Sequence, residues 1–242
     1  MIRIIPAIDI IGGRCVRLTQ GDYDRQRTYG TDPAAMAAEY EKAGCKALHL
    51  VDLDGAKASR PVNLDVLKRI SASTGLEIEF GGGIKSAEAV TEALDNGASQ
   101  VICGSIAVTD HEEVCRWIAR FGRDRIVLGV DTRNGKVATH GWLRDSDLTA
   151  EEVIERFAGA GIRRVVYTDI ACDGMLTGPS FSLYESLQAR FPEIEITVSG
   201  GISSMEDIRR LDRMGLKSVI VGKALYEGRI TIQELEQCLQ NE

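Results

Sequence analysis

The chain has 242 residues, of which 44% are apolar and 27% charged, and its formal net charge is -7. No stretch is long and apolar enough to span a bilayer, and the first residues carry no secretory cleavage pattern, so we expect a cytoplasmic protein without membrane association. A negative net charge is not typical of nucleic-acid binders. The six cysteines form no C-x-x-C pair and are expected to be free thiols, mostly buried, rather than metal ligands.

Apolar, β-branched runs alternate along the chain with segments of helical spacing. The runs predict eight strands, over residues 2–8, 47–53, 76–80, 100–103, 126–130, 164–168, 194–198 and 218–221. The intervening segments present one apolar stripe each, as in Met205, Ile208 and Leu211. Such alternation favours parallel strands joined by crossover helices, in an open doubly wound sheet or a closed barrel.

Capping residues mark where several of these helices begin. Asp32 precedes a proline, Ser86 stands two residues before Glu88, and Thr149 lies three residues before a glutamate, which is the spacing of a capping box. Two long segments after the first and fifth strands, residues 10–32 and 132–147, are expected to be βα loops that close over a ligand.

The second half of the chain repeats the first. Gly83-Ile84 recurs as Gly201-Ile202, 118 residues later, and Asp9 recurs as Asp131, 122 residues later. Eight βα units with this repeat predict a single α/β domain over residues 1–242, a (β/α)8 TIM barrel made of two (βα)4 halves, about 1–122 and 123–242.

Glycine-rich junctions between strand and helix occur twice in each half. Glycine allows backbone N–H groups to approach an anion at a helix N-terminus. We therefore expect two phosphate cradles and a ligand with a phosphate at each end, although glycines that merely form short turns would give the same pattern. The residues concerned are Gly82, Gly83, Gly104 and Ser105 in the first half, and Gly200, Gly201, Gly222 and Lys223 in the second.

Two aspartates stand at the ends of opposite strands, where barrel active sites form. Asp9 follows the first strand and Asp131 the fifth, so their carboxyl groups can flank the middle of a ligand. Different surroundings would let one keep a proton while the other is ionised, but the residues alone do not say which. Capping of the following turns is the alternative explanation for either one.

Further polar residues reach the same end of the barrel. Thr168 and Asp173 follow the sixth strand, while Asp52 and Asp169 are expected to hold loops by hydrogen bonds. His49 lies within a strand, where a core histidine is the usual case.

Trp142 lies in a segment after the fifth strand that reads as exposed. Its ring could stack on a flat heterocycle or simply pack within its loop.

Five motifs in order resemble a known family. They are Ile5-Pro-Ala-Ile-Asp9, Cys15-Val-Arg-Leu-Thr-Gln-Gly21, His49-Leu-Val-Asp-Leu-Asp-Gly55, Gly81-Gly-Gly-Ile84 and Thr168-Asp-Ile-Ala-Cys-Asp-Gly174. The chain resembles the HisA family, the ProFAR isomerases of histidine biosynthesis, over nearly its whole length. The resemblance implies an Amadori rearrangement of an aminoaldose to an aminoketose on a substrate with two phosphates, and no metal or other cofactor.

The resemblance also implies roles for individual residues. Asp131 would be the general acid that opens the ribose ring, and Asp9 the base that takes the proton from sugar C2. Thr168, Asp173 and His49 would support them. Lys85 stands where the family often has arginine, so a charge contact there is kept but a bidentate one is not. The implied substrate- and phosphate-binding residues are Arg17, Gly82, Gly83, Gly104, Ser105, Trp142, Gly178, Gly200, Gly201, Gly222 and Lys223.

Three alternatives remain open at this stage. The sister barrel, a cyclase, has the same halves and aspartates but typically a lysine where this chain has Arg17. A dual-specificity relative would also isomerise phosphoribosylanthranilate. A non-catalytic phosphosugar-binding protein would keep the glycines without needing Asp9 and Asp131. We expect a small biphosphorylated substrate, a monomer, and neither nucleic acid nor membrane as partner.

Overall fold

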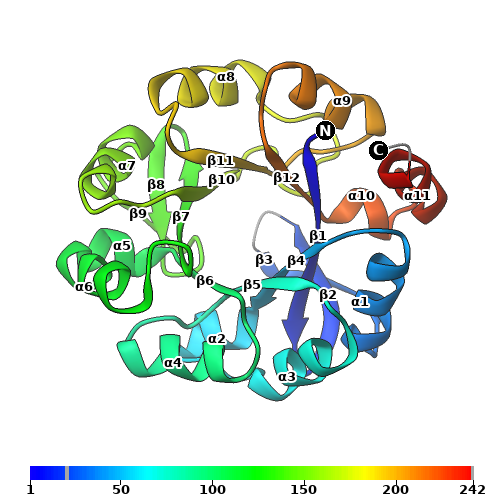
Figure 1. The fold of residues 1–242 in the computed structure, drawn as a ribbon, viewed down its shortest axis with the longest axis horizontal. Coiled ribbons are helices and arrows are strands. Elements are labelled where there is room, and N and C mark those ends of the chain that lie inside the picture. The colour runs from blue at the N-terminus through cyan, green and yellow to red at the C-terminus, as the bar shows by residue number, and fades with distance from the viewer. Residues whose placement is uncertain (20–21, 241–242) are drawn as a thin grey trace.

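The computed structural model describes residues 1–19 and 22–240, and its centre is a closed barrel of eight parallel strands (Figure 1). Neighbouring strands pair in the order β1, β4, β5, β6, β7, β10, β11 and β12, and β12 pairs with β1 to complete the ring. The predicted (β/α)8 barrel is therefore confirmed. The barrel strands are β1 (Arg3–Ile11), β4 (Ala47–Asp52), β5 (Glu77–Gly81), β6 (Gln100–Cys103), β7 (Ile126–Arg133), β10 (Arg164–Asp169), β11 (Glu195–Ser199) and β12 (Ser218–Val221).

Helices surround the barrel, and the predicted capping residues begin three of them. The side chains of Asp32, Ser86 and Thr149 accept hydrogen bonds from backbone N–H groups of the first helical turn, and Thr149 forms a capping box with Glu152. The helices are α1 (Pro33–Lys42), α2 (Leu53–Ala58), α3 (Leu64–Ser73), α4 (Ala87–Asp95), α5 (Ser105–Thr109), α6 (His111–Phe121), α7 (Ala150–Ala158), α8 (Phe181–Arg190), α9 (Met205–Arg213), α10 (Lys223–Tyr226) and α11 (Ile232–Gln240). None of them is long and apolar enough to cross a membrane.

The core consists of two apolar layers separated by the strands. The larger layer lies between the strands and the helices. The smaller one fills the barrel interior with Ile5, Ala7, Ala47, Val127, Val166 and Ile220. Because successive side chains of a strand alternate between these layers, Asp9 points into the barrel two residues beyond Ala7, at its C-terminal end.

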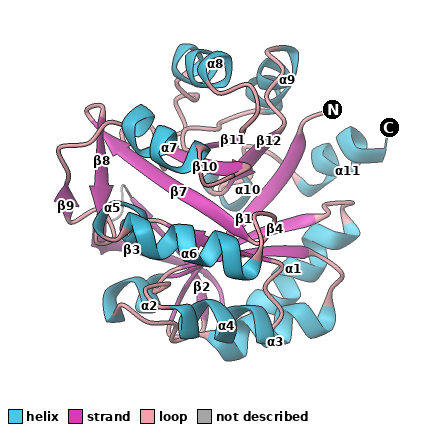
Figure 2. Ribbon diagram, turned by 60° about the vertical axis from the view of Figure 1, so that its left-hand side comes forward, coloured by secondary structure: helices cyan, strands magenta, loops and turns pink. Residues whose placement is uncertain are grey.

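The two segments expected to be long loops contain strands, so that expectation was wrong in part. After β1 come β2 (Arg14–Thr19) and β3 (Asp22–Gly30), antiparallel to each other, with β2 also paired to β1. After β7 come β8 (Lys136–Thr139) and β9 (Arg144–Asp145), which lie beside the end of β7 in Figure 2. In β2, Val16 and Leu18 are buried, and Arg17 between them reaches the carboxylates of Asp9 and Asp173. Residues 20–21 of the first segment lie outside the described residues.

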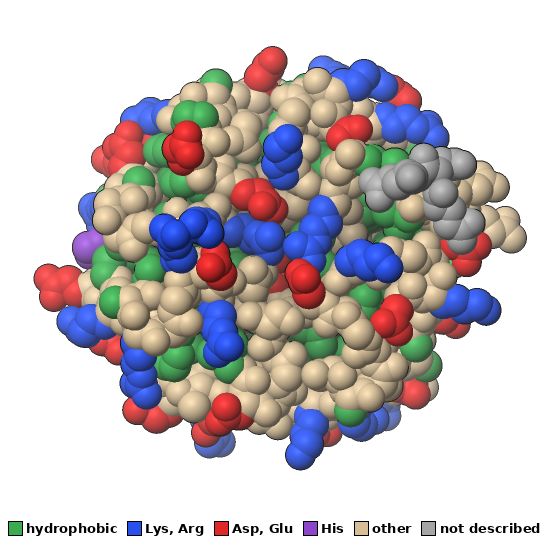
Figure 3. Space-filling model, in the orientation of Figure 1, with side chains coloured by type: hydrophobic (Ala, Val, Ile, Leu, Met, Phe, Trp, Pro, Cys, Tyr) green, Lys and Arg blue, Asp and Glu red, His purple; other side chains and the backbone are tan. Residues whose placement is uncertain are grey.

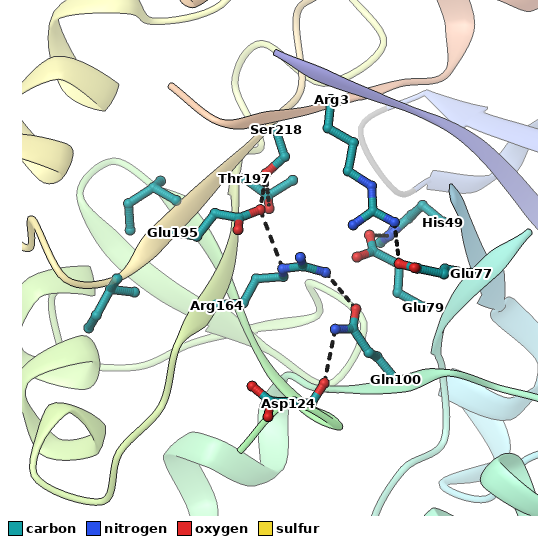
Figure 4. A network of polar contacts seen from close by, with 12 residues as sticks. Arg3, His49, Glu77, Glu79, Gln100, Asp124, Arg164, Glu195, Thr197 and Ser218 are labelled. Atoms are coloured by element: carbon teal, nitrogen blue, oxygen red, sulfur yellow. Dashed lines mark hydrogen bonds and ion pairs between the residues drawn. The ribbon is translucent and has the colours of Figure 1, made fainter. Parts of the chain in front are cut away.

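Polar side chains occupy the N-terminal end of the barrel, where the strands begin (Figure 4). Arg3 pairs with Glu77, and Arg164 contacts both Gln100 and Glu195. Side chains of both signs are interspersed over the face of the molecule seen in Figure 3. The ion pairs of Arg3 and Arg164 therefore lie at the N-terminal end of the interior apolar layer, and the cavity described next lies at its C-terminal end.

Candidate active site

A cavity of about 380 Å³ opens at the C-terminal ends of the strands and is lined by both predicted catalytic aspartates. Asp9 belongs to β1 and Asp131 to β7, and three strands separate β1 from β7 in either direction around the barrel. The two carboxyl groups therefore face each other across the cavity, whose size suits a small-molecule ligand. Among the described residues, no group of three or more His, Cys, Asp or Glu side chains is arranged to hold a metal ion.

Asp9 is buried, with 8% of its surface exposed, and is paired with a cation. The Arg17 guanidinium donates to Asp9 through Nη1 at 2.7 Å and to Asp173 through Nη2 at 3.1 Å. Burial raises the pKa of Asp173, the Arg17 charge opposes that rise, and the nearby carboxylates of Asp9 and Asp131 add to it. Because β2 pairs with β1, Arg17 lies beside Asp9 and bridges the carboxylates of Asp9 and Asp173.

Asp131 has different surroundings, because its partners are neutral donors. Trp142 Nε1 donates to Asp131 Oδ2 at 2.8 Å, and the Thr168 side chain also forms a hydrogen bond with this carboxyl group. Burial raises the pKa of Asp131, while these hydrogen bonds and the charge of His49 partly offset the rise. Asp9 is thus ion-paired, whereas Asp131 is held by neutral hydrogen-bond donors and has a pKa that burial raises.

Trp142 is less accessible than its sequence context indicated. It is half-buried, its backbone has a φ of +70°, and its indole N–H is directed at Asp131 instead of at solvent. Trp142 lies in the turn between β8 and β9, so its loop position was predicted correctly, but its own side chain is half-buried because this turn lies at the cavity.

His49 lies in the barrel interior and also lines the cavity. Its Nδ1 is 2.7 Å from Oε1 of Glu79, on the neighbouring strand β5. It is therefore a hydrogen-bonded interior histidine, as expected, but one whose charge acts on Asp131.

Asp52 and Asp169 hold loops, as the sequence predicted. Asp52 is fully buried and accepts hydrogen bonds from the backbone N–H groups of Gly55, Val62 and Asn63. Asp169 accepts from the backbone of Ala171 and from the Ser180 hydroxyl. Neither residue lines the cavity.

The first predicted cradle lines the main cavity. Gly82 and Gly83 have φ values of +101° and +82°, and a Cβ at Gly82 would lie 2.1 Å from the carbonyl oxygen of Asp52. Backbone packing alone therefore requires glycine at 82. Gly104 differs, since a Cβ there would meet no atom within 4 Å, and Ser105 accepts a hydrogen bond from the His140 backbone. The open approach to a ligand in this cradle is at Gly104.

The second cradle is a separate, narrow cavity of about 20 Å³. Gly200, Gly201, Gly222 and Lys223 line it, and it shares Arg17 and Asp173 with the main cavity. The Lys223 ammonium donates to the carbonyl of Gly174, and a Cβ at Gly222 would lie 2.8 Å from the Arg17 guanidinium.

Gly178 is the one predicted site residue that lines neither cavity. Its backbone N–H donates to the carbonyl of Gly201, and a Cβ at Gly201 would come within 2.4 Å of the Gly178 carbonyl oxygen. Gly178 therefore supports the backbone of the second cradle without lining its cavity.

Residues outside the implied binding set also line the main cavity. Lys85, for which the resemblance implied a charge contact, is half-buried there, and burial lowers its pKa. Ser199 lines both cavities and belongs to the strand that leads into the second cradle, but a single serine carries no sequence signal of its own.

Two carboxyl groups in unlike surroundings, in a cavity bordered by glycine-rich turns at the C-terminal end of the strands, are typical of acid–base enzymes with the (β/α)8 barrel fold. A model of the family described as "Histidine biosynthesis protein" matches residues 3–231. The chain belongs to this family.

Similar proteins span the full length of the chain. A protein of Cytophaga hutchinsonii is 50% identical over 98% of this chain and 99% of its own length. One of Bacteroides thetaiotaomicron is 46% identical over 97% and 98%, and one of Flavobacterium psychrophilum is 46% identical over 99% of each chain. Each of these relatives is named 1-(5-phosphoribosyl)-5-((5-phosphoribosylamino)methylideneamino)imidazole-4-carboxamide isomerase.

Proposed function

We propose that this chain isomerises ProFAR, the substrate in the names of its relatives, to the corresponding ribulosyl compound in histidine biosynthesis. The observation that carries the proposal is the pair of carboxyl groups in one cavity, Asp131 held by neutral donors and Asp9 paired with Arg17. An aldose-to-ketose rearrangement needs one group to give a proton and another to take one. The site provides both.

The proposed reaction begins with ring opening. Asp131 donates its proton to the ring oxygen of the ribosylamine, the bond from C1 to that oxygen breaks, and a protonated Schiff base forms between C1 and nitrogen. Asp9 then removes the proton from C2, and the electron pair of that C–H bond forms the C1–C2 enol-amine. Asp9 then returns its proton to C1, and Asp131 takes the proton of the C2 hydroxyl group as the ketone forms, which restores both carboxyl groups. The electrons are rearranged within the substrate and only protons are exchanged with the two aspartates, so the proposal involves no redox partner and no cofactor.

The remaining site residues are assigned to binding and positioning. Thr168 and Trp142 hold Asp131, and Arg17 with Asp173 holds Asp9. The two cradles are assigned to the two substrate phosphates, the first through Gly104 and Ser105 and the second through Lys223. Occupation of the narrow second cradle would require Lys223 to exchange its carbonyl partner for phosphate oxygens.

We also propose that the protein acts as a monomer in the cytoplasm, with the biphosphorylated substrate as its partner. None of the six cysteines, all of which lie in the described part of the chain, forms a disulfide bond; three are buried and three are half-buried, which is typical of a reducing compartment.

The experiment is an assay of the purified protein on ProFAR and, in parallel, on phosphoribosylanthranilate. Turnover of ProFAR supports the proposal, and turnover of both substrates would broaden it to dual specificity. Asp9→Asn should lower kcat by about a hundredfold or more while substrate binding is kept. Asp124→Asn, on the exposed opposite end of the barrel, is the matched control and should leave kcat unchanged. Inactivity of the folded wild-type protein on both substrates would refute the proposed function.

A further inference from the structure

Glu79 is an acidic residue in an unusual place. Its side chain is turned into the barrel from the middle of β5, and only 2% of its surface is exposed. Transfer of a carboxylate from water into such a site is costly unless a charged or hydrogen-bonding partner compensates for it. Neither the phosphate cradles nor the two catalytic aspartates include this residue, so its presence requires another explanation.

The partner of Glu79 is His49, directly beside it in the register of β4 and β5. Glu79 Oε1 and His49 Nδ1 are 2.7 Å apart (Figure 4). An ionised carboxylate can only accept hydrogen bonds, so this contact requires a proton on Nδ1 of the ring. Glu79 thereby determines which ring nitrogen carries a proton, and it restrains rotation of the ring.

Three groups lie in series from the barrel interior to the cavity. Glu79 contacts His49, and His49 lines the same cavity as Asp131. A buried carboxylate that orients an imidazole next to a reacting group is a recurrent arrangement in acid–base catalysis.

We infer that Glu79 is a positioning residue, which acts on proton transfer at Asp131 through the orientation of the His49 ring. The inference rests on the proposed function. Because His49 and Asp131 line the same cavity, a ring held in one orientation and one tautomer keeps the polar surroundings of the reaction fixed while Asp131 gives up its proton. Glu79 itself touches neither substrate nor Asp131.

The other acidic residue of the same strand provides a matched comparison. Glu77 lies two residues earlier on β5 and pairs with Arg3 at the N-terminal end of the barrel (Figure 4). Its carboxylate is mostly exposed and accepts a hydrogen bond from Arg3. Glu77→Gln removes a carboxylate from the same strand without touching the series of Glu79, His49 and Asp131.

The first test is the tautomer of His49 in Glu79→Gln. A glutamine amide can turn either its oxygen or its NH2 group toward Nδ1, so it accepts both tautomers. The chain contains only three histidines, which makes ring 15N signals assignable with the aid of a His49→Asn sample. We expect Nδ1 of His49 to carry the proton in the wild type and in the control Glu77→Gln. In Glu79→Gln we expect a mixture of the two tautomers.

The second test is kinetic. Glu79→Gln should lower kcat on ProFAR by about tenfold with KM nearly unchanged, while Glu77→Gln keeps the wild-type kcat. In a His49→Asn background the same Glu79 substitution should have little further effect on kcat, because its route of action has been removed.

The outcomes distinguish the inference about Glu79 from the proposed function of the protein. Unchanged kcat and an unchanged His49 tautomer in folded Glu79→Gln would overturn the inference while wild-type turnover still supports the proposed function. Equal losses in kcat from Glu79→Gln with and without His49 would also overturn it, since Glu79 would then act independently of the ring. An inactive wild type would refute the proposed function, and the tautomer measurement on ligand-free protein would still decide what Glu79 does to His49.

Discussion

The hydrogen bond from Trp142 to Asp131 offers the most direct test of how the acid is tuned. Trp142→Phe removes the indole N–H but keeps an aromatic ring over the cavity, so stacking on a substrate base is largely retained. The lost bond, 2.8 Å long, ends on a carboxyl group whose pKa burial raises and this bond lowers. In the variant the pKa of Asp131 should therefore rise further.

The size of the effect follows from the charge of the acceptor. A hydrogen bond to an ionised group contributes about 1.5–3 kcal/mol, which corresponds to about ten- to a hundredfold in kcat if all of it acts on the carboxylate that forms in the transition state. Because the pKa of Asp131 rises, the alkaline limb of the kcat profile should move to higher pH. The loss should consequently be smaller in alkaline buffer than at neutral pH.

The assay is steady-state turnover of ProFAR across a pH series. Trp117→Phe is the control, because Trp117 is the only other tryptophan and its N–H donates to Glu113 on α6, outside the barrel. Wild-type kcat and an unshifted alkaline limb in folded Trp142→Phe would refute this account of Asp131.

Further predictions concern stability and the first cradle. Burial raises the pKa of Asp131, so its ionisation costs folding free energy, and this cost grows as pH rises above about 4. Asp131→Asn should therefore melt at a higher temperature than the wild type near pH 8. Equal melting temperatures of the two proteins at all pH values would contradict this. Asp52→Ala should lower the free energy of unfolding in urea by about 3 kcal/mol or more, since it leaves buried N–H groups such as that of Val62 without an acceptor. Gly82→Ala should lower the free energy of unfolding, because its Cβ would lie 2.1 Å from a carbonyl oxygen. Gly104→Ala should keep wild-type stability and raise KM, because a Cβ there meets no protein atom within 4 Å. An unchanged KM in Gly104→Ala would show that Gly104 is not part of the phosphate site.

Much of the architecture could be predicted because its causes are local. Strand and helix positions follow from the spacing of apolar side chains, and helix starts follow from single residues such as Asp32 and Thr149. Once eight strands are expected to close into a barrel, the positions of Asp9 and Asp131 on opposite strands follow from counting. The two segments after β1 and β7 were harder, because short antiparallel strands depend on a partner that the local pattern does not reveal.

The contacts that distinguish the two aspartates were decided only by the tertiary structure. Arg17 reaches Asp173 across 156 positions of sequence, and Glu79 reaches His49 from the neighbouring strand. The sequence by itself determined which residues stand at the mouth of the barrel, since strand ends meet there whatever the loops do. Which carboxyl group is ion-paired and which is held by neutral donors depends on barrel closure, strand register and the position of β2 and of the turn between β8 and β9 at the cavity. Burial and charge pairing are properties of the surroundings in space, and no residue carries them on its own.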